Sequence, residues 1–223
     1  MKTVETDVLV VGAGPGGSMA AKFAACKGAR TLLVEKRQEI GSPVRCAEAI
    51  AKSWMEECEV PFDPAWVACA PEGARVFAPD GNFAFIDSSH AGDEVGLVIE
   101  RTLFDKALAS HAAEAGAQIL LKTYASGVIR SNGTVRGISG KSMGEDLIIH
   151  AKVTIAADGF ESQVGRWAGL ETALEPDDII STFQYSYPIS NVKPLTATFM
   201  SVPLPLEGIF GYSPKVPESP MSA

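Results

Sequence analysis

The sequence has few cysteines, few histidines and no long apolar run. Its four cysteines are too sparse in 223 residues for a disulfide-stapled fold, and none stands in the C-x-x-C spacing of a zinc site. Its three histidines are scattered and show no ligand spacing, so they predict neither a metal site nor a catalyst. No segment approaches the roughly 18 consecutive apolar residues that a membrane-spanning helix needs. These absences exclude small disulfide scaffolds and helical membrane proteins.

Positive charge is also scarce. The sum of lysine and arginine is 19 against 27 for aspartate and glutamate, a formal net charge of −8 that argues against nucleic acid as a partner. Hydrophobic residues make up 46% of the chain and the mean hydropathy is +0.12, which is too apolar for a disordered protein. The apolar run before Gly12 is too short for a secretory signal and is typical of a first β-strand. Together with the few cysteines, this favours a cytoplasmic protein.

What is present begins with a β-α-β pattern. Residues 7–11 form a short apolar run, and after several glycines residues 18–27 carry small and apolar side chains until Gly28 ends the segment. A second apolar run over residues 31–35 ends in a carboxylate. This order predicts strand, helix and strand, with two parallel strands joined by a right-handed crossover.

The middle of the chain changes its period. Short alternating runs over residues 73–100, with a turn at Pro79-Asp80-Gly81, predict an antiparallel insert that contains a hairpin. Helical spacing returns over residues 105–115. Residues 128–150 then read as a β-meander, and residues 153–157 as a buried strand. The sequence therefore predicts an α/β protein with an additional antiparallel β lobe.

The glycines between the first strand and the first helix form a G-x-G-x-x-G pattern at Gly12, Gly14 and Gly17. Gly12 permits a tight turn, Gly14 lets a pyrophosphate approach the backbone, and Gly17 lets the helix pack against the strand. A plain glycine turn is the alternative, but Glu35 ends the next strand, where an acidic side chain bonds a ribose hydroxyl. We therefore predict dinucleotide binding. A carboxylate at this place disfavours a 2′-phosphate.

A second acidic residue follows the apolar strand near residue 155. Asp158 and Gly159 come directly after it, and in such a fold an aspartate at a strand end can lie near a pyrophosphate or ribityl chain. An Asp-Gly pair after a strand is also an ordinary turn. Taken alone, the pair does not decide between these two interpretations.

Several stretches together resemble a known family. They are Gly12–Gly17, Glu35-Lys36-Arg37, Ile40-Gly41-Ser42-Pro43-Val44-Arg45-Cys46-Ala47-Glu48 and Ala156-Ala157-Asp158-Gly159-Phe160-Glu161-Ser162. From residue 4 to about residue 199 the chain resembles the geranylgeranyl reductase family, above all its archaeal digeranylgeranylglycerophospholipid reductases. The resemblance implies an α/β fold: a Rossmann-like FAD-binding domain of the flavoprotein hydroxylase type with an antiparallel β substrate lobe, here incomplete.

The resemblance also implies roles for single residues. Gly12, Gly14 and Gly17 would hold the FAD pyrophosphate and Glu35 the adenosine ribose, while Asp158 and Gly159 would complete the cofactor site. Cys46, Ala47 and Ala49 would line the flavin side, although related enzymes often have glycine where this chain has Ala47 and Ala49. Arg101 would cap the cofactor and Ala125 would meet the adenine end. An ion pair with Asp105 is the alternative for Arg101, and a small buried thiol the alternative for Cys46.

The implied reaction is the FAD-dependent reduction of isolated C=C bonds in geranylgeranyl chains of membrane lipid precursors. The implied partners are an isoprenoid lipid, an external electron donor and the membrane surface, which the protein would meet peripherally and by apolar contact because a charge of −8 offers no general attraction. An FAD-dependent aromatic-type monooxygenase and a non-catalytic FAD-binding fragment are the alternatives. Five apolar residues could line an isoprenoid cavity or belong to the core: Trp54, Met55, Val60, Phe62 and Trp66.

For the domains we expect residues 1–52 and 96–175 to form the FAD-binding domain. Residues 53–95 and 176–198 would form a partial substrate lobe. Residues 199–223 are proline-rich and aperiodic, and we interpret them as an aberrant, frameshifted tail of a truncated product. On that interpretation the 223-residue chain has little or no activity of its own.

Overall fold

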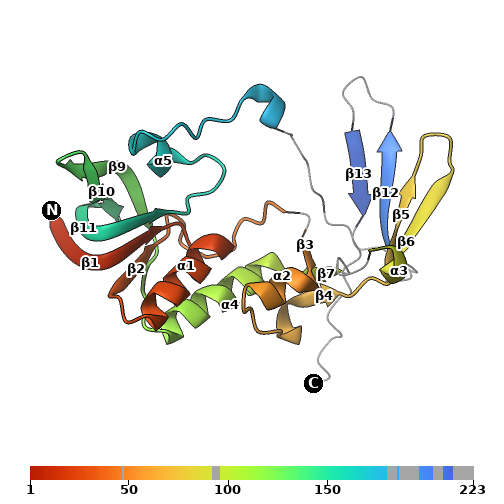
Figure 1. The fold of residues 1–223 in the computed structure, drawn as a ribbon, viewed down its shortest axis with the longest axis horizontal. Coiled ribbons are helices and arrows are strands. Elements are labelled where there is room, and N and C mark those ends of the chain that lie inside the picture. The colour runs from red at the N-terminus through yellow and green to blue at the C-terminus, as the bar shows by residue number, and fades with distance from the viewer. Residues whose placement is uncertain (47, 92–95, 180–184, 186–195, 203–207, 213–223) are drawn as a thin grey trace. The chain divides into compact units, whose positions relative to one another are not determined.

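The computed structural model describes residues 1–223 except 47, 92–95, 180–184, 186–195, 203–207 and 213–223. The chain folds into two compact units (Figure 1). The first unit consists of Met1–Val44 and Thr102–Thr182, and the second of Arg45–Arg101 and Phe183–Ala223.

The first unit is built on a six-stranded sheet with the order β8-β2-β1-β11-β10-β9. Its strands are β1 (Lys2–Val11), β2 (Thr31–Val34), β8 (Gln118–Leu120), β9 (Thr123–Ser131), β10 (Thr134–Ser142) and β11 (Glu145–Ala156). β1 pairs in parallel with β2 and β11, and β2 pairs in parallel with β8. β9, β10 and β11 form an antiparallel meander. The predicted β-α-β unit and meander are thereby confirmed.

Both faces of the parallel strands are buried, which is why their sequences read as unbroken apolar runs. Val10 packs with alanines of α1 (Pro15–Cys26) and α4 (Arg101–Glu114) on one face, where these two helices lie (Figure 1). Leu9 belongs to the core on the opposite face, together with Ile149 of β11 and Val164 of the short helix α5 (Gln163–Trp167). The unit also contains the 3₁₀ turn η3 (Pro176–Asp178).

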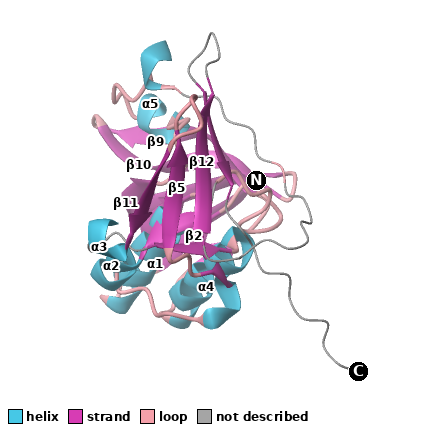
Figure 2. Ribbon diagram, turned by 90° about the vertical axis from the view of Figure 1, so that its right-hand side faces the viewer, coloured by secondary structure: helices cyan, strands magenta, loops and turns pink. Residues whose placement is uncertain are grey.

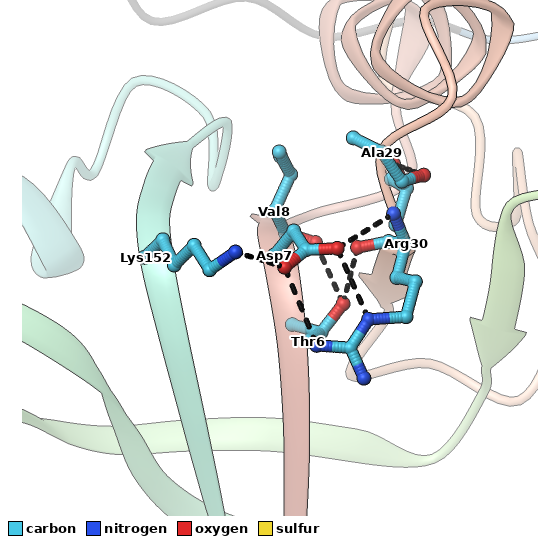
Figure 3. A network of polar contacts seen from close by, with 7 residues as sticks. Thr6, Asp7, Val8, Ala29, Arg30 and Lys152 are labelled. Atoms are coloured by element: carbon cyan, nitrogen blue, oxygen red, sulfur yellow. Dashed lines mark hydrogen bonds and ion pairs between the residues drawn. The ribbon is translucent and has the colours of Figure 1, made fainter.

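A polar network joins the three central strands (Figure 3). The carboxylate of Asp7 on β1 accepts hydrogen bonds from the side chain of Arg30, which precedes β2, and forms an ion pair with Lys152 of β11 at 2.8 Å. The Thr6 hydroxyl donates to the Arg30 carbonyl oxygen at 2.6 Å. The hydrogen bonds from Arg30 and Lys152 hold the pKa of Asp7 well below its usual range.

The second unit contains two sheets. The larger sheet has the order β13-β12-β5-β6, and Figure 2 shows β5 and β12 side by side, where they pair in parallel. Its strands are β5 (Gly73–Phe77), β6 (Phe83–Asp87), β12 (Thr196–Val202) and β13 (Gly208–Tyr212). β5 and β6 form the predicted hairpin, in which the Ala78 N–H donates to the Asn82 carbonyl oxygen at 2.8 Å. The smaller sheet, with the order β3-β7-β4, consists of β3 (Ala49–Ala51), β7 (Gly96–Ile99) and β4 (Val67–Cys69).

Short helical segments complete the second unit: α2 (Lys52–Glu57), α3 (Ser88–Ala91) and η1 (Pro64–Trp66). Met55 and Trp66 are buried and belong to the core, whereas Trp54 and Phe62 are more than half exposed, at 65% and 62%. The Phe62 and Trp66 rings pack edge to face, with their centroids 5.7 Å apart. The apolar residues at this end of the unit therefore divide between core and surface.

The boundaries of the units differ from the expected domain boundaries. Residues 45–52 and 96–101 group with the second unit, because β3 pairs with β7 rather than with the parallel sheet. Residues 199–223, which we expected to be aperiodic, contain the end of β12 and all of β13. The physical reason is that Gly208–Tyr212 contains isoleucine, phenylalanine and tyrosine, which favour strands, and β12 offers an edge for antiparallel pairing. Which unit serves the cofactor and which the substrate stays a prediction.

Candidate functional site

The candidate site begins where β1 ends in the glycine loop. The Gly12 N–H donates to the Val34 carbonyl oxygen at 2.8 Å, and the backbone has a φ of +104° that favours glycine. A Cβ atom at Gly12 would lie 2.2 Å from the Ala157 carbonyl oxygen. The loop is thus held tightly between the ends of β2 and β11, the two neighbours of β1 in the sheet.

Gly17 lies in the first turn of α1 and lets the helix approach the loop. A Cβ atom there would lie 1.8 Å from the Gly12 carbonyl oxygen, so no larger residue fits without movement. The packing role predicted for Gly17 therefore has a direct physical basis in the structure.

Gly14 differs from the other two glycines. It is the N-cap of α1, its φ of −72° is open to any residue, and a Cβ atom there would meet nothing within 4 Å. No side chain caps the helix, and its first turn carries no acidic residue. An uncapped helix start with open space in front of it suits an anion, because its first N–H groups and the helix dipole are both favourable to negative charge. This end of α1 fits a pyrophosphate.

Glu35 follows β2 and reaches the glycine loop. One carboxylate oxygen, Oε2, accepts a hydrogen bond from the Ala13 N–H at 2.9 Å, and Oε1 accepts one from the Arg37 N–H at 2.9 Å. Each carboxylate oxygen has a second lone pair, so the half-buried group can still accept from a hydroxyl. The hydrogen bond to Ala13 was not foreseen from the sequence, because spacing alone does not tell which loop atom the carboxylate meets.

Asp158 follows β11, and its backbone lies against Gly12: its Cα atom would be 3.2 Å from a Cβ placed there. Its carboxylate accepts a hydrogen bond from the Val164 N–H at 2.9 Å and so caps the start of α5. Gly159 has a φ of +86°, which fits a tight turn. Both interpretations of this pair therefore have a basis here, and a role toward a cofactor stays a prediction.

The segment after β11 is also tied to the end of β2. Lys36 forms an ion pair with Glu161 at 3.6 Å, and both side chains are about half exposed, at 56% and 47%. Exposed pairs of this kind contribute little to stability.

Ala125 lies on β9, and its half-buried side chain packs against the core that contains Leu9. The start of β9 comes back to the end of β2, because the Thr123 N–H donates to the Glu35 carbonyl oxygen at 2.8 Å. Ala125 is thus two residues beyond a direct neighbour of Glu35. Its predicted contact with adenine stays a prediction.

The residues expected beside the flavin belong to the second unit, and the structure brings two of them to Glu48. The Cys46 sulfur accepts a hydrogen bond from the Glu48 N–H at 3.3 Å, and the Glu48 carboxylate accepts one from the Arg101 N–H at 3.2 Å. Ala49 is exposed at the start of β3, and Ala47 lies outside the described residues. These contacts leave both interpretations of Cys46 and of Arg101 open.

Glu48 is the residue that sequence reasoning missed. It is 3% exposed, its backbone has a φ of +67°, and its carbonyl oxygen accepts a hydrogen bond from the Ile99 N–H at 2.8 Å. A buried carboxylate in a left-handed backbone conformation is uncommon for a non-glycine residue. The only signal in the sequence was its place at the end of the stretch that begins at Ile40.

Among the described residues, no group of three or more His, Cys, Asp or Glu side chains is arranged to hold a metal ion. None of the helices described is both long and apolar enough to cross a membrane.

Comparison with known proteins identifies relatives of this arrangement. The family model described as FAD binding domain matches residues 5–200. The digeranylgeranylglycerophospholipid reductase of Methanocella arvoryzae is 51% identical over 195 residues, which are 87% of this chain and 50% of the relative. That of Methanothrix thermoacetophila is 56% identical over 173 residues, 78% of this chain and 44% of the relative. The chain thus spans about half the length of the curated relatives it matches.

Solved structures of related proteins share the fold of this chain. A geranylgeranyl bacteriochlorophyll reductase-like protein from Thermoplasma acidophilum superposes with a TM-score of 0.79 at 43% identity, covering 89% of this chain and 50% of that one. The p-nitrophenol 4-monooxygenase of Pseudomonas putida has a TM-score of 0.69 at 18% identity, over 98% of this chain and 60% of that one, and shares the fold alone. The flavoprotein hydroxylase type of fold is confirmed.

Proposed function

Because the chain belongs to the family of FAD-binding domains, we propose that it holds FAD along the carboxyl edge of β2, β1 and β11. The observation that carries this proposal is the hydrogen bond between Glu35 and the Ala13 N–H, which fixes a carboxylate beside an uncapped helix start. The N-terminal turn of α1 takes the pyrophosphate, with Gly12 and Gly17 keeping the loop narrow and Gly14 leaving it open. Glu35 accepts from the adenosine ribose, and Ala125 lies at the adenine end.

The reaction we propose is the reduction of isolated C=C bonds in geranylgeranyl chains of lipid precursors. This proposal is supported by sequence identities of 51% and 56% to proteins named digeranylgeranylglycerophospholipid reductase. When bound in its reduced form, FAD would supply the hydride for this chemistry, an acid or water would supply the proton, and an external electron donor would reduce the flavin again. Since the chain spans about half of those relatives, the reaction is proposed for the protein that carries this sequence.

The chain's own residues would position and shield the reacting groups. Cys46, Ala47 and Ala49 line the flavin side, and Arg101 caps the cofactor from the start of α4. The Cys46 thiol positions the prenyl chain or passes a proton toward it, which is consistent with its half-buried place beside Glu48. Asp158 and Gly159 complete the phosphate end, with the Asp158 carboxylate holding α5 in place.

We also propose that this chemistry takes place at a membrane surface, because the proposed substrate is a lipid. The protein would bind the bilayer peripherally, and the net charge of −8 gives no general attraction to anionic headgroups. Contact with the lipid would therefore be local and apolar.

The test separates cofactor binding from reduction. Purified chain is first titrated with FAD, and binding is followed by flavin fluorescence. It is then given dithionite-reduced FAD and a digeranylgeranylglycerophospholipid in detergent, and mass spectrometry measures whether the lipid gains two hydrogens for each double bond. Binding without any mass gain would leave the chain an FAD-binding module, and absence of binding would refute the proposal as a whole.

The Cys46→Ala variant tests the flavin side. In a form of the protein that reduces the lipid, we expect unchanged FAD affinity and slower reduction, because the thiol would act on the substrate and not on the pyrophosphate. Cys26→Ala, which alters an exposed cysteine on α1, is the matched control and should leave both quantities unchanged.

A further inference from the structure

Strand β6 is an edge of the larger sheet in the second unit. It pairs with β5 on one side, and no strand in the described part of the chain pairs with its other side. In an antiparallel hairpin, residue pairs that exchange backbone hydrogen bonds alternate with pairs that do not. Because Ala78 and Asn82 form a hydrogen-bonded pair, Phe83, Phe85 and Asp87 belong to the pairs that do not. The backbone N–H and C=O groups of these three residues therefore point to the outer edge.

This edge lacks the features that usually protect edge strands. Its first four residues include neither a charge nor a proline, and Phe83, Phe85 and Ile86 are 57%, 43% and 41% exposed. The edges of the sheet in the first unit differ. β9 carries Arg130 and pairs with β10 through register shifts, and β8 has only three residues. An open, regular and apolar strand edge is a template for pairing with another strand.

We propose that β6 pairs antiparallel with β6 of a second copy of this chain, about a two-fold axis at Phe85. In this register Phe85 faces its own counterpart, and Phe83 faces the position of Asp87 in the other copy. All three residues with outward backbone groups then form hydrogen-bonded pairs. On the other face of the sheet, Ala84 lies opposite Ile86 of the other copy, so two apolar contacts repeat about the axis.

Charge favours a second copy as the occupant. The Arg75 guanidinium lies over the Phe83 ring, 5.8 Å from its centre, and Arg75 pairs with Phe85 across the hairpin. The proposed register brings an Asp87 carboxylate opposite Phe83 and next to this guanidinium. Hydrogen bonds from Ser89 and His90 lower the pKa of Asp87 to about 2, so its carboxylate is charged at neutral pH. The edge is thus complementary to itself in backbone hydrogen bonding and in charge.

The size of the contact sets the expected strength. One five-residue strand pair buries less than the roughly 1,200 Å² of a standard interface. We therefore expect a weak dimer whose population rises with concentration in the micromolar range. Sedimentation velocity of the 223-residue chain over that range measures this. A chain that stays monomeric throughout, or that forms polydisperse aggregates instead of a dimer, would overturn the proposal.

A charge at the axis tests the location. Phe85→Lys places two like charges opposite each other and should abolish the concentration dependence. Val76→Lys adds the same charge to an exposed position on β5, away from the outer edge, and should leave it intact. Association that survives Phe85→Lys contradicts the proposal, provided that circular dichroism matches the unaltered chain.

A disulfide tests the register without depending on the lysine variants. The cysteines are introduced into a chain whose exposed Cys26 and Cys58 are replaced by serine. A mixture of Ala84→Cys and Ile86→Cys chains should give an oxidised dimer, because facing residues at such a pair have Cα atoms about 4.5 Å apart. Each variant alone should not, since like positions are then about 8 Å apart. Equal cross-linking of the single variants, or none in the mixture, would refute the two-fold register.

Discussion

Glu35 Oε2 lies 2.9 Å from the Ala13 nitrogen, so the residue that follows β2 holds the loop that follows β1. The same carboxylate accepts from the Arg37 N–H through its other oxygen. One side chain therefore fixes both its own turn and the glycine loop. Substituting it changes the shape of the loop as well as any contact with a ribose.

Glu35→Ala should weaken FAD binding by about 1–3 kcal/mol, because two backbone donors lose their acceptor and a charge-assisted bond to the ribose is lost. Titration of FAD by flavin fluorescence measures the change. Glu39→Ala is the control, since Glu39 is about half exposed and pairs with Lys106 on the surface. An FAD affinity that is the same in all three chains would count against the assigned role.

Substitution by alanine should lower stability at Gly17 and FAD binding at Gly14. At Gly17 the added Cβ atom would lie 1.8 Å from the Gly12 carbonyl oxygen, so Gly17→Ala should lower the free energy of unfolding by about 1–3 kcal/mol. At Gly14 the added atom would meet nothing within 4 Å, so the fold should keep its stability while FAD binding weakens. Urea denaturation and FAD titration of both variants separate the two effects. Loss of stability in Gly14→Ala would show that the space beside it is not open.

The sequence was sufficient for the first strands and the glycine loop because their signals are local. An unbroken apolar run, three spaced glycines and a carboxylate at the next strand end led to β1, α1, β2 and Glu35. The hairpin of β5 and β6 followed from one turn and the alternation around it.

Other features depend on contacts between distant segments. β3 has three residues, too few for a period, and it exists because β7 pairs with it. The position of Glu48 is set by Ile99 and Arg101, about fifty residues further along the chain, as the separation of 53 to Arg101 indicates. The capping contact of Asp158 with Val164 likewise depends on how the turn after β11 closes. Local sequence patterns do not predict such contacts.

The Asp7 network predicts a pH dependence of stability. Hydrogen bonds from Arg30 and Lys152 lower the pKa of Asp7 in the folded chain below its unfolded value, which is about 3.9. The stabilisation by the ionised carboxylate is therefore fully present above that value and is lost as the pH falls through the folded pKa. Asp7→Asn should be less stable than the unaltered chain at neutral pH, and the difference should shrink in acid below about pH 4.

Urea denaturation at a series of pH values checks this prediction. Asp146→Asn is the control, because Asp146 forms a more exposed ion pair with Lys141 at 3.5 Å. The prediction is contradicted if the difference in the free energy of unfolding between Asp7→Asn and the unaltered chain stays the same at every pH down to the lowest one measured. The charge of Asp7 would then not contribute to stability.

Glu48 combines a strained backbone with a buried acceptor, and the two contributions can be separated. Its φ of +67° costs an ordinary side chain about 1–2 kcal/mol relative to glycine. Its carboxylate accepts from the Arg101 N–H at the start of α4, and losing such a buried acceptor costs about 1–3 kcal/mol. Glu48→Ala keeps the strain and loses the hydrogen bond, whereas Glu48→Gly loses both the strain and the hydrogen bond.

We therefore expect the free energy of unfolding to fall from the unaltered chain to Glu48→Gly and further to Glu48→Ala. This order reverses the usual one, in which glycine is less stable than alanine because its unfolded chain has more freedom. Glu57→Gly and Glu57→Ala, at an exposed residue of α2, should show the usual order in the same measurement. If Glu48→Gly proved less stable than Glu48→Ala, the left-handed conformation would not be a source of strain. If neither variant lost stability, the hydrogen bond to Arg101 would contribute nothing, and the start of α4 would be held by other contacts.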